Sequence, residues 1–429
     1  MRLSMASMHV RLLPILLGQV LGLACGVVGV RVTTQLVPPS VFGRYSLFLT
    51  FTSVGMWVIY AGMIKFTARH WAAAPDKDAL RRDLTRGVRR KFPSLALVCL
   101  VGTFVTGEPQ WPWIYAVLFV TAVLLSTAQL AQTALQAARQ HWRDCATISA
   151  GAATRSFVPP LMYTAMGGSA LALYGGYCLH ALVFAAAGWW MLRGHLRSAE
   201  VGPESAPLLT TVYEGPLFVV LAIVGWAGLG LTRWVSAYFF GIETTGYFVL
   251  ASNIAMLVPS VLGTIFLQYF QPGFFAAASE DQAARRQLAR HVDRVAMVHA
   301  ALALTGLCAL RAVAPLLVGP LIHETYRPTL PLMIPAGCAT LALTTGYFYQ
   351  SLLLAGKCER AIGYVELSAA AVLVTGTIAF ALAGEAWFFR WLLVTPIVPW
   401  IVNRPLARRY YFMPASADGS ATARKGTYA

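Results

Sequence analysis

Long apolar stretches and short polar connectors alternate from one end of the chain to the other. The apolar stretches approach the length that an α-helix needs to cross a bilayer, about 20 residues, and the connectors carry charged or turn-forming residues. This pattern predicts twelve transmembrane helices, of which the third is short. The predicted spans are about residues 12–32, 44–66, 92–107, 113–135, 145–166, 170–192, 215–236, 246–268, 295–318, 331–354, 362–383 and 386–403, with ends accurate to a few residues.

The first apolar run could be mistaken for a signal peptide, because Arg2, His9 and Arg11 precede it. No small-residue cleavage site follows it, however, and the segment 31–44 leads directly into the next apolar run. We therefore expect the first helix to be retained.

The turn between the first two spans contains Val37, Pro38, Pro39 and Ser40. Two adjacent prolines interrupt a helix, and a serine can cap the helix that follows. We expect a turn at the outer membrane surface, with Ser40 as the cap of the second span.

Composition supports a membrane protein. Apolar residues make up 58% of the 429 residues and charged residues only 12%, against about 45–50% and about 25% in globular domains. A soluble fold would have too little polar surface. The predicted class is therefore an all-α polytopic membrane protein.

The net charge of +16 is explained by topology and not by nucleic-acid binding. If the N-terminus is cytoplasmic, 25 of the 33 lysines and arginines lie in cytoplasmic segments and three in outer connectors, with five inside spans. This positive-inside asymmetry predicts that both termini are cytoplasmic, and anionic lipids are a further expected contact. The seven cysteines show no CxxC spacing, so no disulfide, metal site or cofactor is expected.

The chain contains two halves that echo each other. A polar connector at residues 192–216 separates six spans from six, which gives an N-lobe (1–192), a cytoplasmic linker (193–214), a C-lobe (215–403) and a cytoplasmic tail (404–429). In the first half a glycine-rich helix leads to Arg31 and then to Gly43, and in the second half a similar helix leads to Arg233 and then to Gly246. The segments "LQAARQHWR" and "LLAGKCER" form a second echo, each at the end of the fourth span of its half.

The order of these segments resembles a known family. The series "LVPPSVFGRYSLF", "LQAARQHWR", "TRWVSAYFFGIETTGYF", "QPGFFAAASEDQAARRQLAR", "APLLVGPLIHETYRPTLPLM" and "LLLAGKCERA" is similar to the Wzx-like oligosaccharide flippases of the multidrug/oligosaccharidyl-lipid/polysaccharide exporter superfamily. The family pattern often has an acidic residue where this chain has Thr232.

The resemblance implies a fold and a function. It implies two six-helix lobes in a V-shaped arrangement and the transfer of polyprenyl-diphosphate-linked oligosaccharide, such as an O-antigen, capsule or exopolysaccharide unit, from the cytoplasmic to the periplasmic leaflet of a bacterial inner membrane. The implied partners are this lipid-linked oligosaccharide, membrane lipids, and the proteins that polymerise the polysaccharide and set its chain length.

Arg155 is the strongest candidate for a contact with such an anionic substrate. It lies well inside the fifth span, where an arginine costs about 2.5–3.5 kcal/mol on insertion scales. Pro159 and Pro160 follow it and free two backbone carbonyls, which is tolerable next to protein or a water-filled cavity. The alternative is a structural ion pair with Glu366, the carboxylate that lies clearly within a span.

Further candidate residues are ionisable groups in or near the spans. Lys65, Arg31 and Arg233 lie near span ends, where they could contact the substrate or reach the lipid headgroups. Arg311 and Arg390 lie several residues inside the outer boundary and could guide the released diphosphate or reach the interface. Glu366 could carry a coupling proton or cation or act as the counter-ion of Arg155, and His180 could be a proton site or a packed, hydrogen-bonded histidine.

Other functions are less consistent with the sequence. A multidrug exporter of the same superfamily would need carboxylates in its cleft to bind organic cations, and the predicted spans contain only Glu366. An enzyme would need clustered carboxylates, whereas those in the outer connectors stand singly, and no phosphate-binding G-x-x-x-x-G-K-[ST] loop is present. A scaffold for polysaccharide assembly remains as a non-transporting alternative. We therefore expect a secondary transporter that works by alternating access and not an enzyme.

Overall fold

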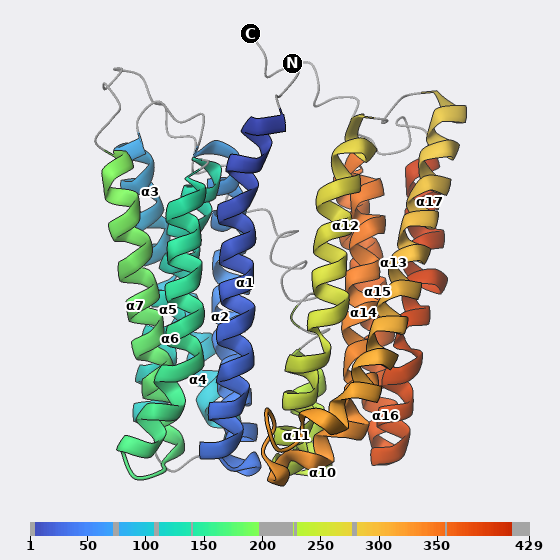
Figure 1. Cartoon of the computed structure of the whole chain (residues 1–429). Helices are drawn as coiled ribbons and strands as arrows, with labels where there is room; N and C mark the ends of the chain where they lie inside the picture. Colours follow the sequence, from blue (N-terminus) through green and yellow to red (C-terminus); the bar gives the residue numbers. More distant parts are fainter. Residues whose placement is uncertain are drawn as a thin grey trace. The chain divides into compact units, whose positions relative to one another are not determined.

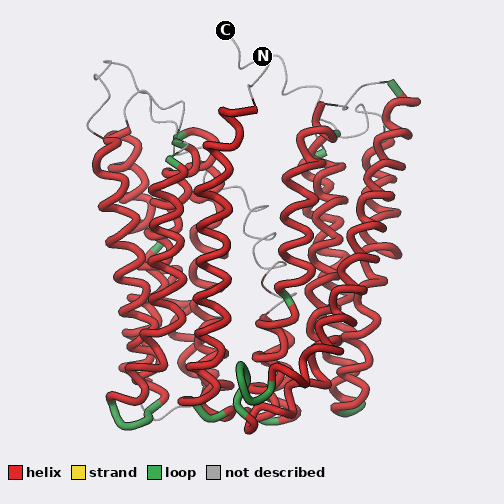
Figure 2. Tube along the Cα trace, viewed as in Figure 1, coloured by secondary structure: helices red, strands yellow, loops and turns green. Residues whose placement is uncertain are grey.

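The protein is helical throughout the residues that its computed structural model describes, which are 5–71, 77–106, 111–138, 140–196, 226, 230–276, 281–356 and 358–413. Figure 2 shows helices joined by short turns, and no β-strand is found in these ranges. One isolated bridge joins Val318 and Ile322. The all-α class predicted from the sequence is confirmed.

The helices belong to two units, which are described separately. Among the described residues, unit 1 contains those up to Trp226 together with Gly230–Val249 and Val313–Leu330. Unit 2 contains Leu250–Ala312 and the residues from Pro331 onward.

Unit 1 is built mainly from the helices of the first half of the chain (Figure 1). Helix α1 packs against α6, α6 against α7, and α5 against both α7 and α2. Small residues permit these contacts: a Cβ on Gly176 of α7 would lie 2.6 Å from the Cα of Pro159 in α6. The helices are α1 Met5–Leu36, α2 Pro39–His70, α3 Lys77–Arg90, α4 Phe92–Thr106, α5 Trp111–Ala137, α6 His141–Ala165, α7 Ala170–Leu196, α10 Thr232–Phe240 and the greater part of α11 Ile242–Ala255.

Unit 2 is centred on a helix that is buried along most of its length. This helix, α14, contacts α12, α15, α16 and α17. The last segment of the chain bends by 41° between Glu385–Ile397 and Pro399–Phe412, with a π-helical turn at Pro399–Asn403. The helices are α12 Leu257–Ala276, the greater part of α13 Gln282–Leu317, α14 Met333–Ala355, α15 Glu359–Leu382, α16 Glu385–Val394 and α17 Arg404–Phe412. The 3₁₀ helix η2 Glu324–Leu332, most of which belongs to unit 1, precedes α14.

Six helical stretches in the described residues are long and apolar enough to cross a membrane, or seven if the bent pair is one span. The protein is therefore a multi-pass membrane protein. The count of twelve spans and the V-shaped arrangement stay predictions, since most of the seventh predicted span, 215–236, lies outside the described residues. The six stretches are Pro112–Ala137, Ala170–Arg193, Ile242–Phe275, Gln282–Leu317, Glu324–Ala355 and Ala361–Leu382.

One local expectation needs correction, and one helix was not predicted. Helix α2 begins at Pro39 and has no side-chain cap hydrogen bond, so the prediction that Ser40 caps it is wrong. Pro38 takes an extended conformation and Pro39 occupies the first turn, where a missing N–H costs nothing. The basic connector after the second span contains a helix, α3, which buries Leu80, Leu84 and Val88 at helical spacing.

Candidate functional site

Arg155 and Arg233 are brought together in unit 1. Arg155 lies on α6 and is exposed, whereas Arg233 lies in the first turn of α10 and is half-buried. The charge of Arg155 acts on Arg233. In the described part of the chain neither guanidinium has a hydrogen bond or an ion pair. The two guanidiniums carry like charges, so each disfavours the charged form of the other, and an anion between them would reduce this repulsion.

A polar and aromatic wall flanks Arg155. Its charge also acts on Tyr45 of α2 and on His180 of α7, both of which are buried. Thr154 Oγ1 and His180 Nδ1 are 2.8 Å apart, so the residue next to Arg155 is hydrogen-bonded to α7. The rings of Tyr45 and Tyr177 meet edge to face with centroids 6.0 Å apart, and those of Tyr177 and His180 are 5.2 Å apart. The hydrogen bond between Thr154 and His180 holds the turn of α6 that carries Arg155 against α7.

Arg31 has a partner elsewhere in unit 1. Its Nη1 donates a hydrogen bond to the carbonyl oxygen of Gly319, in the turn that follows α13. The same turn is held by Thr34 Oγ1, which accepts a hydrogen bond of 3.2 Å from the backbone N–H of His323. Tyr326 Oη then donates to the Val37 carbonyl at 2.8 Å. The hydrogen bond from Arg31 thus links the turn at residues 318–323 to the end of α1.

The remaining cations proposed from the sequence are dispersed. Arg311 lies on α13 in unit 2 and is half-buried, and Arg390 lies on α16 with its guanidinium 4.9 Å from the centre of the Trp387 ring. Lys65 belongs to α2, but its side chain lies outside the described residues. Arg311 and Arg390 thus belong to unit 2, whereas the arginine pair belongs to unit 1.

Glu366 lies in unit 2 among neutral polar groups. Asn403 Nδ2 donates to Glu366 Oε1 at 3.4 Å, and the side chain of Gln350 acts on the same carboxyl group. Tyr347 is close enough to interact electrostatically. Asn403 ends the π-helical turn that precedes α17, and π-turns often occur at functional positions. The pairing of Glu366 with Arg155 joins the two units and stays a prediction.

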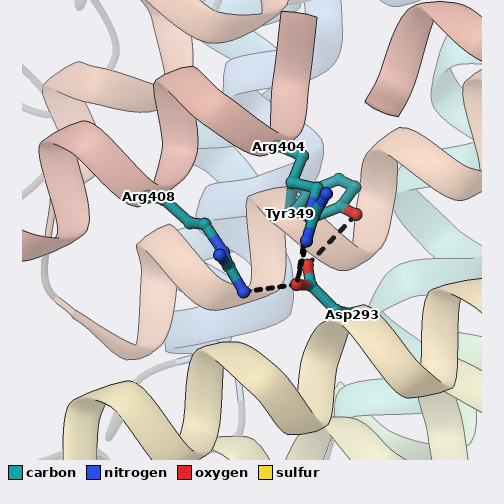
Figure 3. A network of polar contacts seen from close by, with 4 residues as sticks. All are labelled: Asp293, Tyr349, Arg404 and Arg408. Atoms are coloured by element: carbon teal, nitrogen blue, oxygen red, sulfur yellow. Dashed lines mark hydrogen bonds and ion pairs between the residues drawn. The ribbon is translucent and has the colours of Figure 1, made fainter. Parts of the chain in front are cut away.

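A second carboxylate in unit 2 was not singled out by the sequence analysis. Asp293 of α13 is buried, and its Oδ2 accepts hydrogen bonds from Arg404 Nε at 3.1 Å and from Arg408 Nη2 (Figure 3). Tyr349 of α14 donates to Oδ1 at 3.3 Å. The sequence signal is one aspartate among four arginines in residues 285–294, but its two arginine partners fall in the segment assigned to a cytoplasmic tail.

Comparisons with known proteins identify the fold. No protein-family model matches the chain, and no curated protein matches its sequence. Among solved structures, the chain is similar to a MATE protein in complex with MaD3S, with a TM-score of 0.54 and 12% identity over 94% of this chain and 93% of the other. It is also similar to the MATE transporter ClbM in complex with Rb⁺, with a TM-score of 0.47 and 13% identity over 96% and 93% of the two chains. The chain is thus an all-α, multi-pass membrane protein, and its fold is the one found in MATE transporters.

Proposed function

We propose that this protein is a secondary flippase of the multidrug/oligosaccharidyl-lipid/polysaccharide exporter superfamily. Its substrate would be a polyprenyl-diphosphate-linked oligosaccharide, moved from the cytoplasmic to the periplasmic leaflet by alternating access. The fold is compatible with this function, and the observation that carries the proposal is the pair Arg155 and Arg233, two neighbouring cations without a carboxylate partner in the described part of unit 1.

The arginine pair suits a diphosphate for chemical reasons. A guanidinium presents parallel N–H donors that match two phosphate oxygens, and charge-assisted hydrogen bonds are roughly twice as strong as neutral ones. A diphosphate between two guanidiniums would also remove their mutual repulsion.

A multidrug-type exporter of the same superfamily is the second candidate, because the fold of this chain is equally compatible with multidrug export. The half-buried carboxyl group of Glu366 favours it, since an organic cation would pair with a carboxylate. The two candidates therefore predict substrates of opposite charge, an anion for the flippase and a cation for the multidrug exporter.

Transport by the purified protein in liposomes would separate the candidates. We would follow whether a polyprenyl-diphosphate-linked oligosaccharide in the inner leaflet becomes accessible to an external, membrane-impermeant sugar-modifying enzyme. We expect protein-dependent exposure of the sugar and no accumulation of an organic dye cation in the same vesicles. Cation transport without sugar exposure would support the multidrug exporter, and folded protein that moves neither would support a scaffold.

We further propose that Glu366 takes up the coupling proton or cation. In the Glu366→Gln variant the amide oxygen can keep the hydrogen bond from Asn403, but the side chain cannot change charge. Transport by wild-type protein should accelerate when an ion gradient is imposed, and the variant should run at one rate with or without the gradient.

Glu385→Gln is the matched control, because Glu385 is an exposed carboxylate in the first turn of α16. It should respond to the gradient as wild type does. A Glu366→Gln variant that still accelerates would exclude this carboxyl group as the coupling site.

The proposal includes the membrane, the orientation of the chain and the partner proteins. The positive-inside asymmetry supports two cytoplasmic termini, and the resemblance to Wzx-like flippases implies a bacterial inner membrane. The polysaccharide polymerase and chain-length proteins would receive the flipped unit on the periplasmic side.

A further inference from the structure

Seven arginines lie on two segments of unit 2 whose side chains meet. Gln282–Arg294 and Arg404–Phe412 together contain these seven arginines and a single carboxylate, Asp293. Asp293 joins the segments through its ion pairs with α17, and the guanidinium of Arg285 lies 4.6 Å from the centre of the Tyr411 ring. We call this set the α13–α17 arginine cluster; its members are Arg285, Arg286, Arg290, Arg294, Arg404, Arg408 and Arg409.

Asp293 holds two of these arginines in place without neutralising both. Arg404 and Arg408 donate to the same oxygen, Oδ2, so two positive charges converge on one negative charge (Figure 3). Their side chains remain 42% and 33% exposed, which leaves them accessible to a ligand. Arg408 Nε is buried and has no hydrogen-bond partner in the described part of the chain. The pair is thus preorganised and retains an excess of positive charge and donors.

The cluster lies where a helix passes from polar to apolar sequence. Arg294 is the last arginine before the apolar stretch of α13 that begins at Val295, and Arg286, Arg290 and Arg294 are exposed. Helix α17 carries the half-buried Tyr410 beside its arginines. Arginines and tyrosines in this arrangement are typical of the level at which a membrane protein meets the lipid headgroups.

We propose that the α13–α17 arginine cluster binds the phosphate groups of anionic phospholipids. A guanidinium pairs with two phosphate oxygens at once, and a headgroup phosphate would supply the negative charge that Asp293 provides only in part. A lipid is favoured over a free phosphate, because the exposed arginines of α13 extend the positive area along the membrane surface. The inference does not depend on the proposed function.

The cluster can be tested by removing Asp293 and the two arginines that it holds in place. Purified protein in nanodiscs that contain phosphatidylglycerol and phosphatidylcholine would be analysed by native mass spectrometry for the lipids that stay bound. The variant Asp293→Asn/Arg404→Gln/Arg408→Gln removes two arginines and their aspartate, so no buried carboxylate is left unpaired. The variant loses one net positive charge. Since one basic side chain near an anionic surface contributes about 1 kcal/mol to lipid binding, we expect the preference for phosphatidylglycerol over phosphatidylcholine to fall about fivefold.

Helix α3 provides a matched control. Asp83→Asn/Arg86→Gln/Arg89→Gln also removes two arginines and one aspartate, including the ion pair of 3.1 Å between Arg86 and Asp83. This control should keep the preference for phosphatidylglycerol. An equal loss in both variants would replace the proposed site by diffuse attraction between the basic protein and anionic lipid.

A competition with inorganic phosphate and a second variant complete the test. Inorganic phosphate that displaces phosphatidylglycerol from wild type at matched ionic strength would make this a site for soluble anions. If the cluster variant does not fold, Arg290→Gln/Arg294→Gln, which leaves the Asp293 ion pairs intact, should lower the preference instead. A folded variant of either kind with wild-type lipid preference would overturn the proposal.

Discussion

Replacing Gly43 or Gly246 with alanine should destabilise the protein, and valine should do so more strongly. A Cβ on Gly43 would lie 2.1 Å from the carbonyl oxygen of Ile242, and a Cβ on Gly246 would lie 2.0 Å from that of Pro39. Both obstacles are backbone atoms, which cannot turn aside as a side chain can. We expect a loss on the order of 1–3 kcal/mol for each alanine, from the cost of overpacking, measured as a lower unfolding temperature in detergent.

Gly26 provides the control for this prediction. It lies in α1, and a Cβ built on it would meet nothing within 4 Å. Gly26→Ala should be neutral or stabilising by up to about 1 kcal/mol, because alanine favours a helix over glycine. If Gly43→Ala and Gly246→Ala melt at the wild-type temperature, the ends of α2 and α11 do not cross as closely as the structure indicates.

The same two glycines show what a repeat in the sequence can predict. They were matched because each follows an arginine in a corresponding order, Arg31 in one half and Arg233 in the other. The structure places them against each other, so that each glycine makes room for the backbone of the opposite segment. Sequence similarity marked both positions, but it could not show that they meet, because pairwise contact between repeats depends on the tertiary fold.

The helices themselves were largely predictable from the sequence, since an apolar run of bilayer length has few alternatives to a helix. The second predicted span, 44–66, corresponds to α2, and the fifth, 145–166, to α6. Helix α3 was missed because its apolar positions, three residues among many charges, give an amphipathic signal that average hydropathy hides. The search for long apolar runs could not detect such a helix.

The candidate site was predictable only in part. Arg155, Arg233 and His180 were chosen because ionisable groups are costly in a membrane, and the structure groups them. Arg31 was chosen on the same grounds, yet it hydrogen-bonds to a backbone carbonyl, an acceptor that no sequence pattern reveals. Asp293 was overlooked because its neighbours in sequence are not its partners, which come from α14 and α17.

The largest functional effect is expected for Arg155. If its guanidinium binds the diphosphate, Arg155→Ala should lower the rate of oligosaccharide flipping about tenfold to a hundredfold, the equivalent of one charge-assisted hydrogen-bonding group. Arg155→Lys should recover only part of the rate, because an ammonium group cannot pair with two phosphate oxygens in the same way. Arg233→Ala should show a loss of similar size, since the two charges act at one place. The initial rate of sugar exposure in proteoliposomes measures each effect.

Stability measurements distinguish a binding role of Arg155 from a structural one. Arg155 is exposed and has no hydrogen bond or ion pair in the described part of the chain, so its removal should change the free energy of unfolding by no more than about 0.5 kcal/mol. Arg327→Ala is the matched control, because Arg327 is an exposed arginine of unit 1 that pairs with Glu324 at 3.8 Å and lies in η2. That variant should flip the substrate at the wild-type rate. An Arg155→Ala variant that transports normally would remove the anion-binding role on which the proposed function depends, whereas one that is slow and also unstable would indicate that Arg155 supports the fold.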